Sequence, residues 1–280
     1  MLPEILGAKS GVFTQRICAY NESFSPLEKK VGESIGFLWH QGIAGRNDED
    51  VTSCFVKLLQ LFTLRGVINL IVWLDNCTAQ NKNWTLFSAL VAVLNSLAGS
   101  LKSISLKYFE QGHTFMSADS FHHRIELRVR QKGDLCDFDD FVGCVAEAGS
   151  TIVMKDDDFL DWKNELSAGK QSKESKPRLD KVVEAFFKKG ETKLFFKESH
   201  ADAEYKSSEF LKRKFLAAIR SGTAWPSPTS YKGIKLDRKQ GIISTLVPLM
   251  PQHHGQFWQD GKLVATVQQE GLMRLRVPKS

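Results

Sequence analysis

The chain has 280 residues, of which 42% are hydrophobic and 25% are charged, a composition typical of a globular protein. No stretch reaches about 18 uninterrupted apolar residues, so the sequence predicts no transmembrane helix. The N-terminal segment has neither a basic leader nor a long apolar core, which argues against a signal peptide. Five widely spaced cysteines without a CxxC pair favour an intracellular location, nuclear or cytoplasmic, over a disulfide framework or a zinc module.

The net charge of +6 is unevenly distributed along the chain. Residues 1–150 carry 14 Lys and Arg against 16 Asp and Glu, whereas residues 151–280 carry 24 against 16. A nearly neutral half followed by a basic half suits a core that performs chemistry and an extension that meets an anion such as nucleic acid. A solvated basic surface without a partner is the alternative.

The first predicted elements are two strands and a helix. Residues 11–21 and 33–45 are rich in β-branched and aromatic residues and are separated by turn residues, which predicts two antiparallel strands. In residues 47–66, Asn47 or Asp48 can cap a helix whose apolar positions recur at helical spacing until Gly66 ends it.

The middle of the chain alternates strands and helices. Residues 67–75 form an apolar run that predicts a strand buried on both faces and ending at Asp75. Asn83 can cap the next helix, residues 100–110 alternate like a strand, and a basic amphipathic helix begins near Ser117. This order predicts an α/β fold with a mixed sheet in which the strands before and after the Asn83 helix run parallel.

The remaining segments are less regular. Residues 137–149 are predicted to be helical, residues 150–162 to begin with a short strand, and residues 164–180 to form a linker. The segments "VVEAFF" and "EFLKRKFLAAI" have helical spacing, with phenylalanines in the core and Lys and Arg outside. We therefore predict two domains, a core at residues 11–150 and a mostly helical basic extension at residues 151–280.

Two aspartates follow successive predicted strands. If the strands run parallel, Asp75 and Asp119 emerge on the same rim of the sheet, where carboxylates can hold the divalent metal ions of a phosphoryl-transfer site. Each residue could instead cap the helix that follows it, and Asp48–Asp50 could serve only the dipole of their helix. Competing chemistries are poorly supported, because the sequence contains no HExxH, GxGxxG, GxxxxGK[ST] or GxSxG motif.

Two blocks of residues carry a family resemblance. The segments "WLDNCTAQNKNWTLFSAL" and "KYFEQGHTFMSADSFHHRIE" resemble a domain of uncharacterised animal proteins that derive from DNA transposons and have an RNase H-like transposase core. "GRNDEDVTSC" and the late "LVPLMP" are similar to it as well, so the resemblance spans most of the chain. The matching positions are Asp75, Asn76, Cys77, Gln80, Asn81, Lys82 and Asn83 in the first block, and Gly112, His113, Thr114 and Asp119 in the second.

The resemblance implies a site and an ancestral reaction, the Mg²⁺-dependent cleavage and strand transfer of DNA. It implies that Asp75 and Asp119 hold Mg²⁺ or Mn²⁺, with Asp50 as a third candidate carboxylate. Gln80, Asn81 and Lys82 would shape the rim, with Lys82 able to approach a phosphate. His113 would orient Asp119 or a phosphate, or serve only the turn.

The resemblance also predicts that the site is incomplete. In the family the first aspartate comes from a strand upstream of a segment similar to "MLPEILGAKSG", and this sequence has no aspartate before Asp48. We therefore expect the chain to begin after the first catalytic strand, to leave an open sheet edge there, and to bind metal ions weakly. The rival hypotheses are a non-enzymatic nucleic-acid-binding protein and a protein-interaction module, both derived from a transposase.

The basic residues of the second half of the chain predict that its partner is DNA. Its lysines and arginines would meet the phosphate backbone without sequence specificity, and a homo-oligomer is left open, whereas a membrane partner is not expected. The candidate contacts are Lys188, Lys189, Lys212, Arg213 and Lys214.

Overall fold

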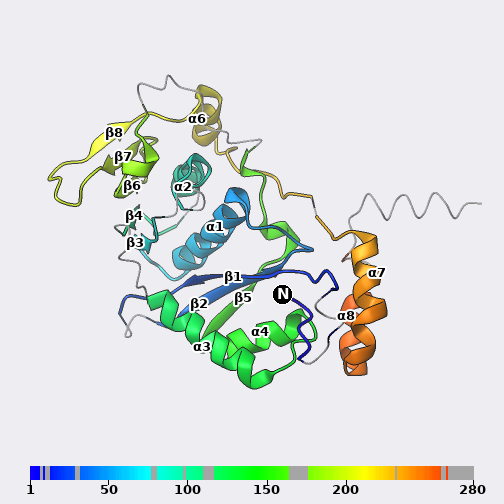
Figure 1. The fold of residues 1–280 in the computed structure, drawn as a ribbon. Helices are drawn as coiled ribbons and strands as arrows, with labels where there is room; N and C mark the ends of the chain where they lie inside the picture. Colours follow the sequence, from blue (N-terminus) through cyan, green and yellow to red (C-terminus); the bar gives the residue numbers. More distant parts are fainter. Residues whose placement is uncertain are drawn as a thin grey trace, which may run out of the picture. The chain divides into compact units, whose positions relative to one another are not determined.

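The computed structural model describes residues 1–6, 9, 13–28, 32–76, 81–96, 99–109, 117–163, 176–230, 232–259 and 263. The chain divides into two compact units, and the elements of both are labelled in Figure 1. Unit 1 comprises Met1–Gly45, Phe115–Asp156 and Ser230–Ser280, and unit 2 comprises Arg46–Thr114 and Asp157–Thr229. Both units take segments from either side of residue 150, and the division into 11–150 and 151–280 stays a prediction.

Unit 1 contains a three-stranded sheet in the order β1-β2-β5. β1 (Ala19–Phe24) pairs antiparallel with β2 (Ile35–His40), which confirms the predicted antiparallel pairing. β1 overlaps the strand predicted at residues 11–21 only at residues 19–21, and it continues into residues that were predicted to form the turn. β2 is buried along its whole length and pairs on its other side, in parallel, with β5 (Ser150–Val153).

Helices pack against this sheet and extend its core. α3 (Ser117–Lys132) and α4 (Phe138–Ala146) contact each other and the sheet, which confirms both predicted helices. Buried side chains from the strands and helices, among them Leu38, Phe121 and Trp258, form one core. The C-terminal elements of the unit are α7 (Leu236–Thr245), η5 (Val247–Leu249), η6 (Gln252–His254) and α8 (Gly255–Gln259).

Unit 2 contains a five-stranded mixed sheet in the order β3-β4-β6-β7-β8. β3 (Asn69–Leu74) pairs in parallel with β4 (Ser103–Tyr108), so the predicted crossover between parallel strands is confirmed. The other three strands are antiparallel to their neighbours. They are β6 (Glu184–Lys188), β7 (Leu194–Lys197) and β8 (Lys206–Ser208).

Two long helices, α1 (Asp48–Leu64) and α2 (Trp84–Ser96), lie side by side in unit 2 (Figure 1). Asn47 and Asp50 form a capping box at the start of α1, and Gly66, with a φ of 76°, follows its end as predicted. The Asn83 side chain accepts a hydrogen bond from the backbone of Leu86, so the predicted cap of α2 is confirmed. The described residues of unit 2 also include α6 (Arg213–Arg220) and η4 (Leu179–Lys181), and η3 (Asp156–Asp158) lies at the boundary of the two units in the sequence.

The α/β fold class is therefore confirmed, but three details differ from the predictions. β3 is an edge strand rather than a strand buried on both faces, and its Ile71 side chain is 56% exposed. The predicted helix at "VVEAFF" is wrong: β6 is a strand in which Ala185 and Phe187 are buried while Phe186 lies on the other face. The basic half therefore contributes three strands to this sheet, β6, β7 and β8, beside its helices.

The third difference is that the described strands form two sheets instead of one mixed sheet. The α/β class does not depend on this difference, whereas likeness to RNase H stays a prediction. Within the described part of the chain, no helix combines the length and apolar composition that a membrane crossing requires.

Candidate functional site

The predicted metal ligand Asp75 directly follows β3, at the carboxyl end of the parallel pair that β3 forms with β4. Its side chain is half-buried, and its Oδ1 accepts a hydrogen bond from the side-chain amide of Asn81. The sequence therefore predicted the location of Asp75 correctly. Asn81 contacts only Oδ1 of Asp75, and this hydrogen bond fixes the orientation of the carboxylate.

A second polar pair lies beside the first. The Nζ of Lys82 donates to the side-chain oxygen of Asn76 and lies 4.5 Å from the centroid of the Tyr108 ring. Lys82 is only 2% exposed, and burial lowers the pKa of its amine, while attraction to Asp180 opposes that shift. The Tyr108 hydroxyl donates to the backbone oxygen of Asn81 over 2.8 Å, which ties the residues after β3 to β4. Lys82 is thus part of the packed interior.

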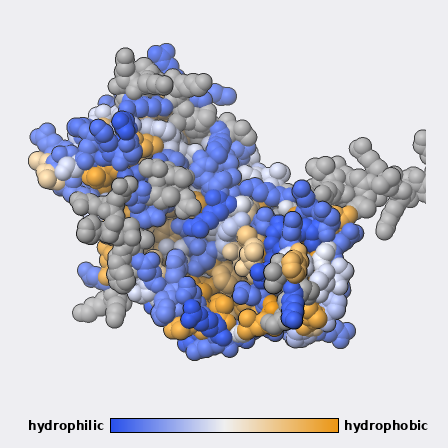
Figure 2. Space-filling view, in the orientation of Figure 1, coloured by the Kyte–Doolittle hydropathy of each residue, from blue (hydrophilic) through white to orange (hydrophobic). Residues whose placement is uncertain are grey.

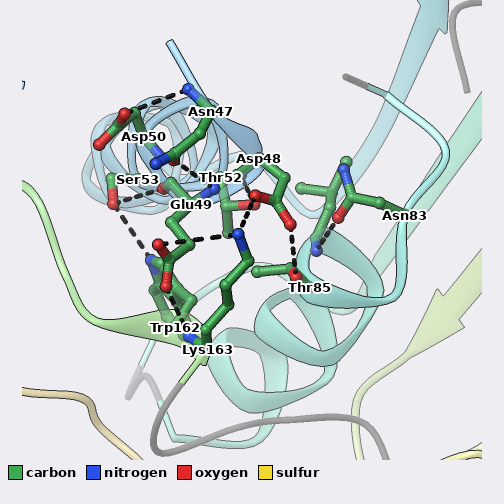
Figure 3. A network of polar contacts seen from close by, with 11 residues as sticks. Asn47, Asp48, Glu49, Asp50, Thr52, Ser53, Asn83, Thr85, Trp162 and Lys163 are labelled. Carbon is green, nitrogen blue, oxygen red and sulfur yellow. Dashed lines mark hydrogen bonds and ion pairs between the residues drawn. The ribbon is translucent and has the colours of Figure 1, made fainter. Parts of the chain in front are cut away.

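The three acids at the start of α1 are engaged in protein contacts, as Figure 3 shows. Asp50 is 2% exposed, and its Oδ2 accepts a hydrogen bond from the backbone nitrogen of Asn47 over 3.1 Å. Asp48 accepts a hydrogen bond of 3.1 Å from Thr85 and pairs with Lys163 over 2.6 Å. These acids cap α1, and Asp48 also binds the segment that contains Lys163. The contacts of Asp50 thus fit the alternative role given to it above, at the N-terminus of its helix.

The remaining predicted site residues fall elsewhere. Asp119 is exposed in the first turn of α3 and belongs to unit 1, whereas Asp75 belongs to unit 2. A metal centre shared by the two aspartates stays a prediction. Gln80 and His113 lie outside the described residues.

The predicted DNA contacts are all exposed, as expected for side chains that meet a phosphate backbone. Lys188 ends β6 and Lys189 follows it, while Lys212 is the N-cap residue of α6 and Arg213 and Lys214 begin that helix. The predicted core role of the phenylalanines nearby is confirmed for Phe187, Phe196, Phe210 and Phe215, which are buried. Phe186 and Phe195 are only half-buried, so the prediction does not hold for them. Figure 2 shows a mostly hydrophilic surface over β6, β7 and β8, with a few hydrophobic side chains.

A cluster that could hold a metal ion lies among residues that no sequence motif had indicated. Cys136, Asp140 and His254 each present one ligand atom, and these three atoms lie within 4.8 Å of one another. Cys136 and Asp140 are buried, and His254 is half-buried. Cys136 and Asp140 flank the start of α4, and His254 ends η6, more than a hundred residues later. No spacing motif could have revealed a ligand set so widely separated in the sequence.

Hydrogen bonds hold this triad in place without a metal ion. Asp140 accepts a hydrogen bond of 2.8 Å from the backbone nitrogen of Cys136 and pairs with Lys132 over 2.8 Å. His254 contacts the Asp137 carboxylate through Nδ1. Burial, together with the nearby carboxylates, raises the pKa of the Cys136 thiol to about 11. A metal ion would have to displace the thiol proton, because the thiolate is the ligand.

Comparisons with protein-family models, with curated proteins and with solved structures find no match to this chain.

Proposed function

We propose that the chain is a transposon-derived, RNase H-like protein that binds DNA. The observation that carries the proposal is the position of Asp75 after a parallel strand, with its carboxylate held by Asn81. Carboxyl ends of parallel strands are where α/β proteins place their chemistry. The ordered match of the Asp75–Asn83 block to the transposon-derived domain gives that position its ancestral function.

Carboxylate oxygens are the ligands that Mg²⁺ and Mn²⁺ prefer, so Asp75 fits such an ion. When bound, the ion would stabilise charge on the attacking and leaving oxygens of a phosphodiester. Asp75 would orient the ion, and Asn81 would keep the carboxylate in position. The role of Asp119 as a second ligand rests on the resemblance alone.

Asp50 fits this role less well than Asp75. Its carboxylate is buried and engaged in the capping box of α1, and a metal ion would have to compete with that hydrogen bond. We infer that metal binding is weak, no tighter than about millimolar, because a site with few carboxylates leaves Mg²⁺ mainly to water.

The second candidate function is DNA binding without cleavage, and the engagement of Asp50 favours it. The exposed residues at the end of β6 and the start of α6 would contact phosphates in either case. The two functions differ in their dependence on Asp75. Cleavage needs its carboxylate, whereas simple binding does not.

Titration calorimetry with Mn²⁺ and a plasmid-nicking assay test the proposal on the full chain. Wild type should bind Mn²⁺ at about millimolar concentration, and Asp75→Asn should remove that binding. Asp157→Asn, a change at an exposed aspartate outside the site, is the matched control and should behave as wild type. Equal Mn²⁺ binding in wild type and Asp75→Asn would contradict the assignment of Asp75. Nicking that depends on Asp75 would favour cleavage over simple binding.

A further inference from the structure

One face of the five-stranded sheet in unit 2 carries aromatic and basic side chains that are only partly buried. On the inner strands, Ile104, Leu106 and Phe187 are buried on one face, whereas Lys107 and Phe186 on the other face are only partly buried. Two polar side chains of this second face, Ser105 and Glu184, are buried. We call this second surface the aromatic face. It comprises Trp73, Lys107, Phe186, Phe195, Lys197 and Tyr205.

The pairing register places these side chains next to one another. Trp73 of β3 lies opposite Lys107 of β4, and Lys107 lies opposite Glu184 of β6. Phe186 lies opposite Phe195 on β7. Directly opposed residues in a sheet share a face, so the register extends the aromatic face across four strands. At about 4.8 Å per strand, the sheet is wide enough for two or three stacked bases.

The rings form two groups. In one group, the Phe186 ring lies 5.4 Å from Tyr205 and 6.2 Å from Phe195, between ring centroids. In the other, the Trp73 ring lies 5.0 Å from Phe109 and 6.0 Å from His200. Tyr205 is 40% exposed, and the Trp73, Phe186 and Phe195 side chains are half-exposed. Ring faces that remain accessible can stack with a planar ligand.

Lysines stand between the two groups of rings. Lys107 lies 5.6 Å from the centroid of Trp73, and Lys197 lies 4.7 Å from that of Tyr205. Glu184, the acid beneath them, is buried and accepts hydrogen bonds from Ser105 and Tyr205. Burial would raise the pKa of Glu184, but these hydrogen bonds and the attraction of Lys107 and Lys197 hold it below its ordinary value. The Glu184 carboxylate is thus buried in the sheet, whereas the amines of Lys107 and Lys197 lie at its surface.

We propose that the aromatic face binds single-stranded nucleic acid. The bases stack on Trp73, Phe186, Phe195 and Tyr205, and the phosphates lie near Lys107 and Lys197. Alternating rings and lysines match the alternating bases and phosphates of a strand, and every base has a ring face, so binding is tolerant of sequence. An apolar protein partner would bury two lysines with one carboxylate, Glu184, to balance them. This surface and ligand differ from the duplex DNA contacts proposed above.

Fluorescence anisotropy of labelled poly-dT and poly-U, titrated with the full chain at about 50 mM salt, tests the inference. Wild type should bind both, with an affinity that falls as salt rises. Phe186→Ala should weaken binding about fivefold or more, the usual effect of losing one stacked base. Phe13→Ala is the matched control, because Phe13 is 90% exposed and lies outside the aromatic face. It should bind as wild type does.

Two further variants separate loss of stacking from loss of the fold. Trp73→Phe should keep binding but reduce the quenching of tryptophan fluorescence by the oligonucleotide, because Phe still stacks. Lys197→Gln removes a partly exposed charge without placing a second carboxylate opposite Glu184, so it should weaken binding while the thermal midpoint stays near that of wild type. Absence of binding by the wild-type chain would overturn the inference. Equal affinity in wild type, Phe186→Ala and Lys197→Gln would overturn it as well.

Discussion

The side-chain amide of Asn81 donates a hydrogen bond to the carboxylate of Asp75, which precedes it by six residues. The next pair, Asn76 and Lys82, makes a contact with the same separation in sequence. Both contacts lie just after β3, so two polar pairs join residues 75–76 to residues 81–82. The carboxylate that the proposed function assigns to a metal ion therefore depends on Asn81 for its orientation.

A double-mutant cycle of Asp75→Ala and Asn81→Ala should reveal this dependence. Each single change should lower the free energy of unfolding by about 1–2 kcal/mol, because it leaves a partly buried polar group without its partner. The double variant should lose less than the sum of the two. Urea unfolding measures all four proteins. Additive losses would mean that the two side chains do not interact in solution.

Ser53 should be needed for stability, whereas Ser88 should not. The Ser53 hydroxyl accepts hydrogen bonds from the backbone of Leu160 over 3.1 Å and from the Trp162 ring over 3.2 Å. Ser53→Ala should therefore cost about 2 kcal/mol. The Ser88 hydroxyl is buried without a hydrogen-bond partner among the described residues, so Ser88→Ala should be neutral or stabilising. Thermal melts that rank the two variants in the opposite order would contradict the network in Figure 3.

Stability should fall between about pH 6.5 and pH 4 because of His40. Burial lowers the pKa of this histidine from 6.5 to about 4, and its Nδ1 accepts a hydrogen bond from the backbone of Gly42. The unfolded chain takes up the proton first as the pH falls, so the folded state loses up to about 3 kcal/mol across this window. His40→Phe should flatten that part of the profile. Urea unfolding at several pH values measures it, and equal slopes in both proteins would contradict the assignment.

The triad of Cys136, Asp140 and His254 should prefer Zn²⁺ or Co²⁺ to Mg²⁺, because thiolate and imidazole are softer ligands than carboxylate. Co²⁺ bound there should give an absorption band from cobalt–thiolate charge transfer. Cys136→Ser should abolish the band. Cys144→Ser, a matched change at another buried cysteine, should retain it. Identical spectra for the two variants would exclude Cys136 as a ligand.

Local signals predicted most elements of the fold correctly. Asn47 caps the start of α1, and Gly66 follows its end with a positive φ. The apolar run before Asp75 identified β3. Each of these features depends on neighbours in the sequence, so a single sequence contains the information. The location of Asp75 at the end of its strand followed for the same reason.

Long-range features could not be predicted in this way. "VVEAFF" fits both helical and strand periods over so short a window, and pairing with β4 and β7 makes it a strand. The burial of β3 was overestimated, because composition does not tell an edge strand from a central one. The metal triad and the aromatic face both join residues from distant segments. Pairing register and tertiary packing determine such clusters.

Duplex DNA binding by the full chain tests the central claim most directly. Fluorescence anisotropy at salt concentrations from about 50 to 200 mM should show an affinity that falls steeply with salt and hardly depends on sequence. Lys212→Glu with Arg213→Glu should weaken binding on every sequence alike and reduce the salt slope. The matched control is Lys155→Glu with Lys235→Glu, which changes two exposed lysines outside the proposed contacts. Absence of duplex binding at about 50 mM salt, or equal binding by the two double variants, would contradict the account.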